Sequence, residues 1–484
     1  MALSSSELKD NWRLITEASG ILLSRLLPKA ASSLIFVLIA RRLGTSLAGS
    51  YMIGISFLNL GTLLTSLGTD ESSLREIAKA PTSSLVYLIN LVVTRAALAV
   101  LGYCLLIALV RVMGYALETQ EMVLILGAGL LPESIIAATF TVFNANRKVL
   151  YMVLIAGLVA FLNLLTVIVA FWTAIPAKAI ASLILAGSVV GALSSLFIAY
   201  NFAKGIALNF GHSQRELFSL LFCKRLIKES LPLFLLILLV SADSELDVLL
   251  LSRIQGPEVV GQYGKARTVI LLLSLIPQAL RMAIYPDMAR TYRASSEIFW
   301  SRYNHIRLTI LILAIPLVIG GWFVSKDLIA FFFGFPSETV VWVFRILLIH
   351  LFFNFLYQPS TRLLVVVNRP SVLSLFLGLS LLLNISINFA VAPHKGALGT
   401  AGARTMSSLV YFILVEFYTA RNFPSSKPSV PVRASLLVIL ASIVMMVLCL
   451  IVSGSTQPWY INIFLSAVAY AGTSGILTLL ARRK

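Results

Sequence analysis

The sequence predicts an all-α polytopic membrane protein of about fourteen transmembrane helices: two parallel six-helix repeats around a central cavity, plus two extra C-terminal helices. The first observation behind this prediction is the composition, because 59% of the 484 residues are hydrophobic and only 12% are charged. Average soluble domains are about 45–50% apolar and about 25% charged. The second observation is that the apolar residues gather in long runs, and the third is that spaced motifs of the first half recur in the second.

The net charge is strongly positive, because 38 Lys and Arg residues against 20 Asp and Glu residues give +18. In a soluble protein such an excess would suggest a nucleic-acid partner, but this chain has too little polar surface for that class. We therefore expect no nucleic acid among its partners. The three cysteines lie in or beside apolar runs and the four histidines do not cluster, so the sequence predicts no metal site.

The predicted transmembrane helices follow from the lengths of the apolar runs. A helix needs about 20 mainly apolar residues to cross the bilayer, because lipid offers backbone groups no hydrogen-bond partner. Such segments occur at 19–40, 47–68, 84–110, 121–143, 149–174, 179–203, 231–252, 266–288, 306–325, 339–358, 371–392, 397–420, 433–453 and 459–480. The longest polar stretch, Lys204 to Glu229, is too short for a separate folded domain, so function must lie between the helices.

The orientation follows from the basic residues of the short loops, which are enriched on the cytoplasmic side of membrane proteins. With a cytoplasmic N-terminus, the inside loops hold most of them, including Lys224, Arg225, Lys228 and the terminal Arg482-Arg483-Lys484. The sequence therefore predicts a multi-pass protein of the cell (inner or plasma) membrane with both termini in the cytoplasm. The same basic loops favour contact with anionic membrane lipid.

Three spaced motifs of the first half recur in the same order in the second half. In the first pair, Arg41-Arg42-Leu43-Gly44 followed by Gly49-Ser50-Tyr51 matches Arg253-Ile254-Gln255-Gly256 followed by Gly261-Gln262-Tyr263. In the second pair, Asn146-Arg147-Lys148 followed by Asn163 matches Asn368-Arg369-Pro370 followed by Asn384. In the third pair, Pro176-Ala177-Lys178 matches Pro393-His394-Lys395. A duplicated set of six helices predicts parallel repeats, the architecture of secondary transporters whose site lies between the halves. The predicted parts are a first bundle at 1–205, a cytoplasmic linker at 206–229, a second bundle at 230–421 and two added helices at 422–484.

These motifs also resemble a known family. The stretch from Ala40 through Tyr51 to Leu67-Gly68 is similar to the opening signature of the polysaccharide-biosynthesis flippases. Later matches are Ser241-Ala242-Asp243, Asp247, Gly256, Val260-Gly261-Gln262-Tyr263, Ala266, Asn368-Arg369-Pro370, Asn384, Asn388 and the stretch from Pro393 to Ala403. The superfamily also contains multidrug and toxin extruders and the lipid II flippase. The resemblance implies transfer of an undecaprenyl- or dolichyl-linked glycan from the cytoplasmic to the outer leaflet, through a central cationic cavity.

Basic residues inside the predicted spans are the candidates for substrate binding in that cavity: Arg25, Lys29, Arg95 and Arg281. Arg25 and Lys29 are four residues apart and therefore share one face of the first helix. A charge within the bilayer is costly, which makes each of these residues a functional hypothesis. Arginine binds a diphosphate through paired hydrogen bonds and lysine binds it as a point charge. The alternative is that these side chains reach the lipid headgroups or pair with an acid.

Acidic and amide residues inside the spans are the candidates for ion coupling: Asp243, Asp247, Asn384 and Asn388. Each pair is one helical turn apart and shares a face, with Glu245 pointing elsewhere. The resemblance to the lipid II flippase implies a sodium site at Asp243, Asn384 and Asn388, with Thr400 or Thr405 as further ligands. A proton on Asp243 is an equal alternative, and the asparagines have the further alternative of joining helices by hydrogen bonds.

Two other functions compete with that of a flippase. A cation-coupled multidrug extruder is expected to have a less basic cavity, and a membrane glycan polymerase needs catalytic residues on a large outer loop. No predicted outer loop exceeds about a dozen residues, so we expect no enzyme and no catalytic residues. We expect no cofactor other than Na⁺ or H⁺ as a coupling ion. The expected partners are a polyprenyl-linked glycan and anionic lipid, and other membrane proteins of the glycan pathway are further candidates.

Overall fold

The computed structural model describes residues 5–173, 175–209, 217–294, 296–335 and 337–423. Every regular element in these ranges is a helix, which confirms the predicted all-α class. The helices are α1 (Ser5–Ser66), α2 (Thr69–Lys79), η1 (Pro81–Ser83), α3 (Ser84–Met113), α4 (Leu117–Gly127), α5 (Leu130–Ala145), α6 (Val149–Trp172), α7 (Ala177–Asn209), α8 (Leu220–Gln255), α9 (Pro257–Leu273), α10 (Leu275–Ala294), α11 (Ser296–Phe323), α12 (Ser325–Phe333), α13 (Glu338–Leu356), α14 (Gln358–Val366) and α15 (Pro370–Asn422).

Nine helical stretches in the described ranges are long and apolar enough to cross a membrane, so the chain is a multi-pass membrane protein. Two of them each join two predicted spans. α1 joins 19–40 to 47–68 across Gly44, and α15 joins 371–392 to 397–420 across Gly396. Both glycines have positive φ, a backbone state open mainly to glycine, so the chain turns there without the separate loop that we expected.

Some predicted spans cross a break in the helix, as 266–288 does between α9 and α10. The span at 121–143 is formed by α4 and α5, which are separated at Ala128-Gly129. α8, the counterpart of 231–252, carries four acidic residues and is not among the nine apolar stretches. The predicted spans 433–453 and 459–480 lie outside the described residues.

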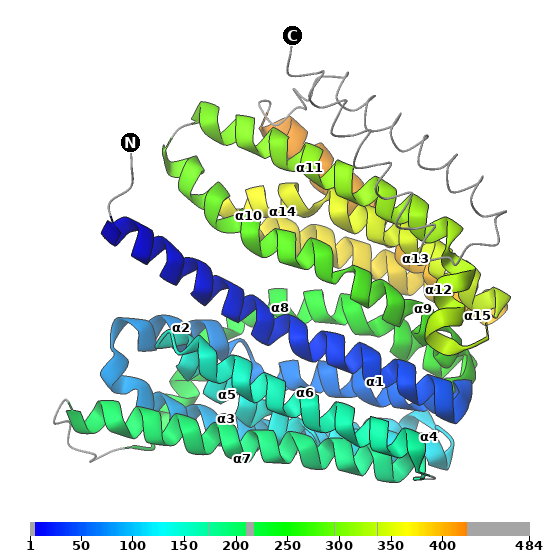
Figure 1. The fold of residues 1–484 in the computed structure, drawn as a ribbon, viewed down its shortest axis with the longest axis horizontal. Coiled ribbons are helices and arrows are strands. Elements are labelled where there is room, and N and C mark those ends of the chain that lie inside the picture. Colours follow the sequence, from blue (N-terminus) through cyan, green and yellow to red (C-terminus); the bar gives the residue numbers. More distant parts are fainter. Residues whose placement is uncertain (1–4, 174, 210–216, 295, 336, 424–484) are drawn as a thin grey trace. The chain divides into compact units, whose positions relative to one another are not determined.

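The first compact unit is Met1–Gly261. In Figure 1, α3, α5, α6 and α7 run side by side below α1 in this unit. α8, the first helix of the predicted second bundle, falls within Met1–Gly261, and polar contacts join it to α1 and α2. Ser56 Oγ on α1 donates to the Glu245 carboxylate of α8 at 2.8 Å, and the hydroxyls of Ser72 and Ser230 lie 2.6 Å apart.

The stretch predicted as a cytoplasmic linker, 206–229, is largely helical in the part that the structure describes. α7 continues to Asn209, and α8 begins at Leu220. Ser219 supports this start, since its hydroxyl accepts a hydrogen bond from the backbone N–H of Phe222 at 3.4 Å. Such a serine satisfies one of the free N–H groups at the beginning of a helix.

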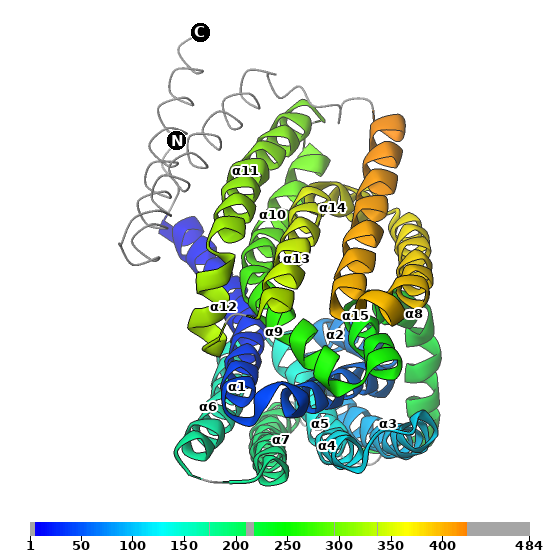
Figure 2. The same ribbon diagram turned by 90° about the vertical axis from the view of Figure 1, so that its right-hand side faces the viewer.

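The second compact unit is Gln262–Lys484, and its boundary with the first falls inside α9. Figure 2 shows α11, α13 and α15 of this unit as neighbouring helices. α13 supplies the buried centre with Val340, Phe344, Leu348, Leu351 and Phe355.

The predicted repeat is visible in the backbone of two glycines from the first pair of motifs. Gly44 has φ 83° and ψ 179°, and Gly256 has φ 82° and ψ −179°. This region of backbone space is open essentially only to glycine. Gly49 and Gly261 belong to the same pair of motifs, and each lies against the opposite copy. A Cβ on Gly49 would collide with the carbonyl oxygen of Pro257, and a Cβ on Gly261 would collide with that of Thr45.

The second pair of repeat motifs is shifted by one position from the predicted register. Arg147 and Asn368 have φ values of 56° and 58°, and each ends a helix in the same way. Lys148 N–H donates to the Phe143 carbonyl and Arg369 N–H donates to the Leu364 carbonyl, both at 2.8 Å. The pairing Asn146 with Asn368 was therefore wrong by one position, because the helix ending and not the residue type sets the equivalence. The corrected register still places Asn163 opposite Asn384.

The third motif pair is not equivalent in the structure. Pro176 precedes α7, whereas Pro393 lies inside α15, shortly before the break at Gly396. The second copy thus passes from one span to the next within a single bent helix.

Candidate functional site

Arg25 and Lys29 lie on α1, and both side chains are exposed. They are one helical turn apart and therefore share a face, as predicted. Arg25 forms no hydrogen bond or ion pair with any other residue that the structure describes. An arginine on an apolar helix with no protein partner is available to an anionic group from outside the unit.

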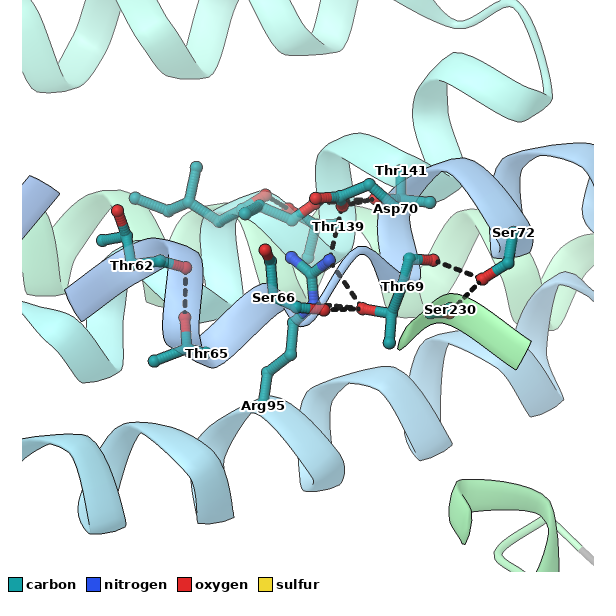
Figure 3. Close-up of polar contacts among 12 residues, drawn as sticks. Thr62, Thr65, Ser66, Thr69, Asp70, Ser72, Arg95, Thr139, Thr141 and Ser230 are labelled. Carbon is teal, nitrogen blue, oxygen red and sulfur yellow. Dashed lines mark hydrogen bonds and ion pairs between the residues drawn. The ribbon is translucent and has the colours of Figure 1, made fainter. Parts of the chain in front are cut away.

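Arg95 is held within the first unit by an ion pair. Its side chain is only 1% exposed, and its Nη2 lies 2.5 Å from Oδ1 of Asp70. The Thr69 hydroxyl accepts from Nη2 at 3.0 Å, and the Thr141 hydroxyl donates to the Asp70 carboxylate at 2.6 Å. We call Arg95, Asp70, Thr69 and Thr141 the first arginine cluster. Figure 3 shows the guanidinium of Arg95 directed at Thr69 and Asp70, which is the acid-pairing alternative stated above.

The first arginine cluster also has one unsatisfied donor. Nη1 of Arg95 is buried and forms no hydrogen bond among the described residues, while the paired Asp70 side chain is 45% exposed. Next to the cluster, Ser72 on α2 meets Ser230 on α8 (Figure 3). The cluster therefore joins α2, α3 and α5 at a point where α8 also packs.

A related cluster in the second unit was missed by the sequence reasoning. Nη2 of Arg307 on α11 lies 2.8 Å from Oε2 of Glu416 on α15. The Ser360 hydroxyl of α14 donates to the same carboxylate, and the Tyr303 hydroxyl lies 2.8 Å from that of Ser360. We call these four residues the second arginine cluster. Arg95 and Arg307 have the same separation along the chain as Gly44 and Gly256, so the repeat could have revealed Arg307 as the counterpart of Arg95.

The acidic residues of α8 have unequal surroundings. Asp243 is half-buried, whereas Asp247 is buried. Glu245, which we expected to point away from their shared face, is also buried and accepts hydrogen bonds from Ser56 Oγ at 2.8 Å and Asn59 Nδ2 at 3.1 Å. Its polar partners lie on α1, far away in the sequence, and no local pattern pointed to them.

Asn384 and Asn388 of α15 are fully buried in the second unit and bond to each other. Asn388 Nδ2 donates to Oδ1 of Asn384 at 2.8 Å, and Asn384 Nδ2 donates to the Ser407 hydroxyl at 3.4 Å. Oδ1 of Asn388 is buried and has no hydrogen-bond partner among the described residues. The pair thus offers a cation one uncommitted amide oxygen, while its other polar atoms already join neighbouring groups. Coupling by Na⁺ or H⁺ at these residues stays a prediction.

Arg281 is the remaining predicted cavity residue. Its backbone is part of α10, but its side chain lies outside the described residues. Its role in binding substrate therefore stays a prediction.

Comparison with known families and structures gives consistent matches. A family model described as "Polysaccharide biosynthesis protein" matches residues 14–292, and the MatE family model matches residues 232–390. The lipid II flippase MurJ in an inward closed conformation has a TM-score of 0.78 at 17% identity, covering 96% of this chain and 98% of the flippase. The eukaryotic MATE transporter AtDTX14 has a TM-score of 0.56 at 16% identity, covering 87% of this chain and 97% of the transporter.

A transporter of the MOP superfamily from Pyrococcus furiosus also matches, with a TM-score of 0.56 at 14% identity over 85% of this chain and 96% of that one. Among curated proteins, none matches the sequence. The matched structures are flippases and transporters rather than enzymes, and at these identities they establish the fold. The family model covers more than half of the chain, so this multi-pass membrane protein belongs to the polysaccharide biosynthesis protein family.

Proposed function

We propose that the protein is a flippase that moves a polyprenyl-(di)phosphate-linked oligosaccharide from the cytoplasmic to the outer leaflet. Membership of the polysaccharide biosynthesis family supports the glycan, and the shared fold with the lipid II flippase supports movement of a lipid-linked cargo. In this proposal the two repeats alternate in exposing the cargo site to the two sides of the membrane.

The observation that carries the proposal is the exposed pair Arg25 and Lys29 on α1. A diphosphate has the charge and the oxygen atoms to bind both: Arg25 through paired hydrogen bonds and Lys29 through its point charge. Arg95 is a weaker candidate for the same role, because its charge is already balanced by Asp70.

The test is flipping of a lipid-linked oligosaccharide by the purified full chain in liposomes. Replacing both residues, Arg25→Ala with Lys29→Ala, should slow flipping by about tenfold or more, since hydrogen bonds to charged groups contribute about 1.5–3 kcal/mol each and tenfold is about 1.4 kcal/mol. Unchanged flipping by the double variant would contradict the proposal.

Two control variants separate charge from folding. The exchange Arg25→Lys with Lys29→Arg keeps both charges and should retain most of the activity. Arg111→Ala removes an exposed arginine at the end of α3 and should leave flipping unchanged.

A cation-coupled multidrug extruder is the second candidate, because the MatE family model matches residues 232–390. The same double variant distinguishes the two. Export of a cationic drug should not fall when basic residues are removed, since like charges repel. Drug export that survives the double variant, together with no glycan flipping by the unaltered chain, would favour the extruder.

Ion coupling is part of the proposal, with Asp243, Asp247, Asn384 and Asn388 as its candidate residues and either Na⁺ or H⁺ as the ion. The uncommitted Oδ1 of Asn388 and the half-buried carboxylate of Asp243 support it. Flipping measured with a Na⁺ gradient, with a pH gradient and with neither decides between the ions, and equal rates in all three conditions would remove the coupling role.

A further inference from the structure

Glu133 is an acidic residue of the first unit that lies near the middle of the candidate span formed by α4 and α5. Its side chain is half-buried. Its carboxyl group has one hydrogen-bond partner among the described residues, the hydroxyl of Ser188 on α7, at 3.2 Å. A carboxylate at this depth with a single neutral partner is strongly disfavoured, whereas the protonated carboxyl is not.

No basic side chain among the described residues balances Glu133 from the helices that pack against α5. Arg95 on α3 is already paired with Asp70 on α2. Asp70 contacts α5 at Thr141, which lies two helical turns, or about 12 Å, along α5 from Glu133. α6 contains no charged residue. The part of α1 that contacts this region, where Gly61 meets Leu130, also has none.

The remaining charged and titratable groups lie elsewhere on these helices. On α7, Lys178 lies about 15 Å and Lys204 about 24 Å from Ser188 along the helix axis. The full set on the helices around α5 is Tyr51 of α1 after Gly44; Asp70, Glu71, Arg75, Glu76 and Lys79 of α2; Tyr87, Arg95, Tyr103, Cys104 and Arg111 of α3; Glu118 and Glu121 of α4; Tyr151 of α6; and Lys178, Tyr200 and Lys204 of α7.

The surroundings of Ser188 provide further polar atoms in this apolar region. Ser188 follows Gly187, which lies so close to α6 that a Cβ would collide with Oδ1 of Asn163. That oxygen is buried and has no hydrogen-bond partner among the described residues. α5, α6 and α7 thus bring a carboxyl, an amide and a hydroxyl group into the middle of the first unit.

Glu133 also follows an interruption of its span. α4 ends at Gly127 and α5 begins at Leu130, so Glu133 lies in the first turn after the break. The second unit also has an interrupted span, at Tyr357 between α13 and α14, but this break lies about two helical turns beyond the position that pairs with Ala128-Gly129 in the register of Asn163 and Asn384. Interrupted spans are a feature of transporter binding sites.

The second unit keeps a protonatable group against a serine of its last described span. Nδ1 of His350 on α13 lies 2.6 Å from the hydroxyl of Ser408 on α15. Ser188 lies 25 residues after Asn163 in the chain. Ser408 lies 24 residues after Asn384, which is the counterpart of Asn163 in the second copy. The two serines are therefore near each other in the repeat but not equivalent, and the group that each meets is an acid in one copy and an imidazole in the other.

We propose that the carboxyl group of Glu133 takes up and releases a proton in each transport cycle, with the Ser188 hydroxyl holding it in place. In uptake, an O–H bond forms between a carboxylate oxygen and a proton delivered by water. In release, the same bond breaks and the proton returns to water. The proposal rests on the proposed flippase function, because the exchange requires a cycle that opens the site to water.

The first test detects the proton without transport. Infrared difference spectra between the purified full chain and its Glu133→Gln variant, both in lipid nanodiscs at neutral pH, should show the C=O stretch of a protonated carboxyl that the variant lacks. Glu118→Gln, a change at an exposed acid of α4, should leave the band in place. Ser188→Ala should keep the band and shift its frequency, because the hydrogen bond is lost. The absence of any such difference between the unaltered chain and Glu133→Gln would overturn the proposal.

The second test measures coupling in liposomes that contain the lipid-linked glycan. A gradient of about one pH unit, a tenfold difference in proton activity, should accelerate flipping by the unaltered chain and by Glu118→Gln. Glu133→Gln should flip at equal rates with and without the gradient. Acceleration by a Na⁺ gradient alone, or an undiminished response in Glu133→Gln, would overturn the proposal. Absence of flipping in every variant would instead contradict the flippase function, while the infrared band still tests Glu133.

Discussion

The two arginine clusters hold equivalent arginines by different means. In the first, Arg95 is 1% exposed and its acid, Asp70, comes from α2 and is 45% exposed. In the second, Arg307 is 23% exposed and its acid, Glu416, comes from α15 and is 18% exposed. The burial thus differs, with a deep arginine and a shallow acid in one unit and two half-buried partners in the other.

The hydroxyl groups that donate to the acids also come from positions that are not equivalent in the two copies. Thr139 is the repeat counterpart of Ser360 in the register that pairs Asn163 with Asn384, but it bonds to its own helix at Ile136. Thr141, half a turn along, donates to the acid instead. The arginine is therefore kept in both copies, whereas the acid and the hydroxyl that neutralise it come from different positions in each. Any acid and hydroxyl close enough to the guanidinium can balance its buried charge.

The largest expected effect is that of removing the acid from the first cluster. Asp70→Asn should lower the free energy of unfolding by about 3 kcal/mol, because it leaves the deeply buried Arg95 without a countercharge. Glu416→Gln should cost less, about 1.5 kcal/mol, because water reaches Arg307. The measurement is reversible unfolding of each variant in mixed micelles.

A double variant is the control for this prediction. Asp70→Asn with Arg95→Met replaces both charges and should recover most of the loss, since an apolar side chain does not need a countercharge. Equal losses for Asp70→Asn and Glu416→Gln would contradict the proposed difference between the clusters.

The next effect concerns the glycines at which the two copies are alike. Gly49→Ala and Gly261→Ala should each destabilise the protein by about 1–3 kcal/mol and by similar amounts, because each Cβ would collide with a backbone carbonyl of the other copy. Thermal unfolding in detergent checks this. Gly402→Ala, at a helical glycine with open space around it, should be neutral or stabilising. A tolerated Gly49→Ala would show that this close approach is not required.

The smallest effect compares the two hydroxyl donors. Thr141→Val should cost about 0.5 kcal/mol and Ser360→Ala about 1 kcal/mol, because Ser360 is buried and serves both Glu416 and Tyr303. Thr139→Val should change little, since its hydroxyl bonds only within α5. The same unfolding assay in micelles measures the stability of all three variants. A larger loss of stability for Thr141→Val than for Ser360→Ala would contradict the larger contribution expected of the Ser360 hydroxyl.

Much of the fold was predictable, because it depends on local and periodic features. Apolar runs indicated the spans from α1 to α15, and Gly44 and Gly256 indicated the repeat that the backbone angles confirm. The register of the second motif could not be read correctly, because asparagine identity was followed where a helix ending decides. The joining of spans across Gly396 was also missed, since a glycine with positive φ is equally consistent with a loop.

The candidate sites were predictable only in part. The position of Arg25 and Lys29 on one exposed face followed from their spacing on a helix. The partners of Arg95 did not follow, because Asp70 and Thr141 lie on other helices, one well before it and one well after it in the chain. Glu245 and Glu133 were passed over for the same reason, since their hydrogen-bond partners are on distant segments.

The amino-acid sequence alone specifies a helical membrane protein with a duplicated architecture, because hydropathy and helix geometry act over a few neighbouring residues. It also determined which charges enter the spans. Folding decides which of those charges are neutralised within the protein, as Arg95 is, and which stay exposed, as Arg25 does. The reason is physical: the state of a charge in an apolar medium depends on the groups within a few ångströms, and these come from helices that only folding brings together.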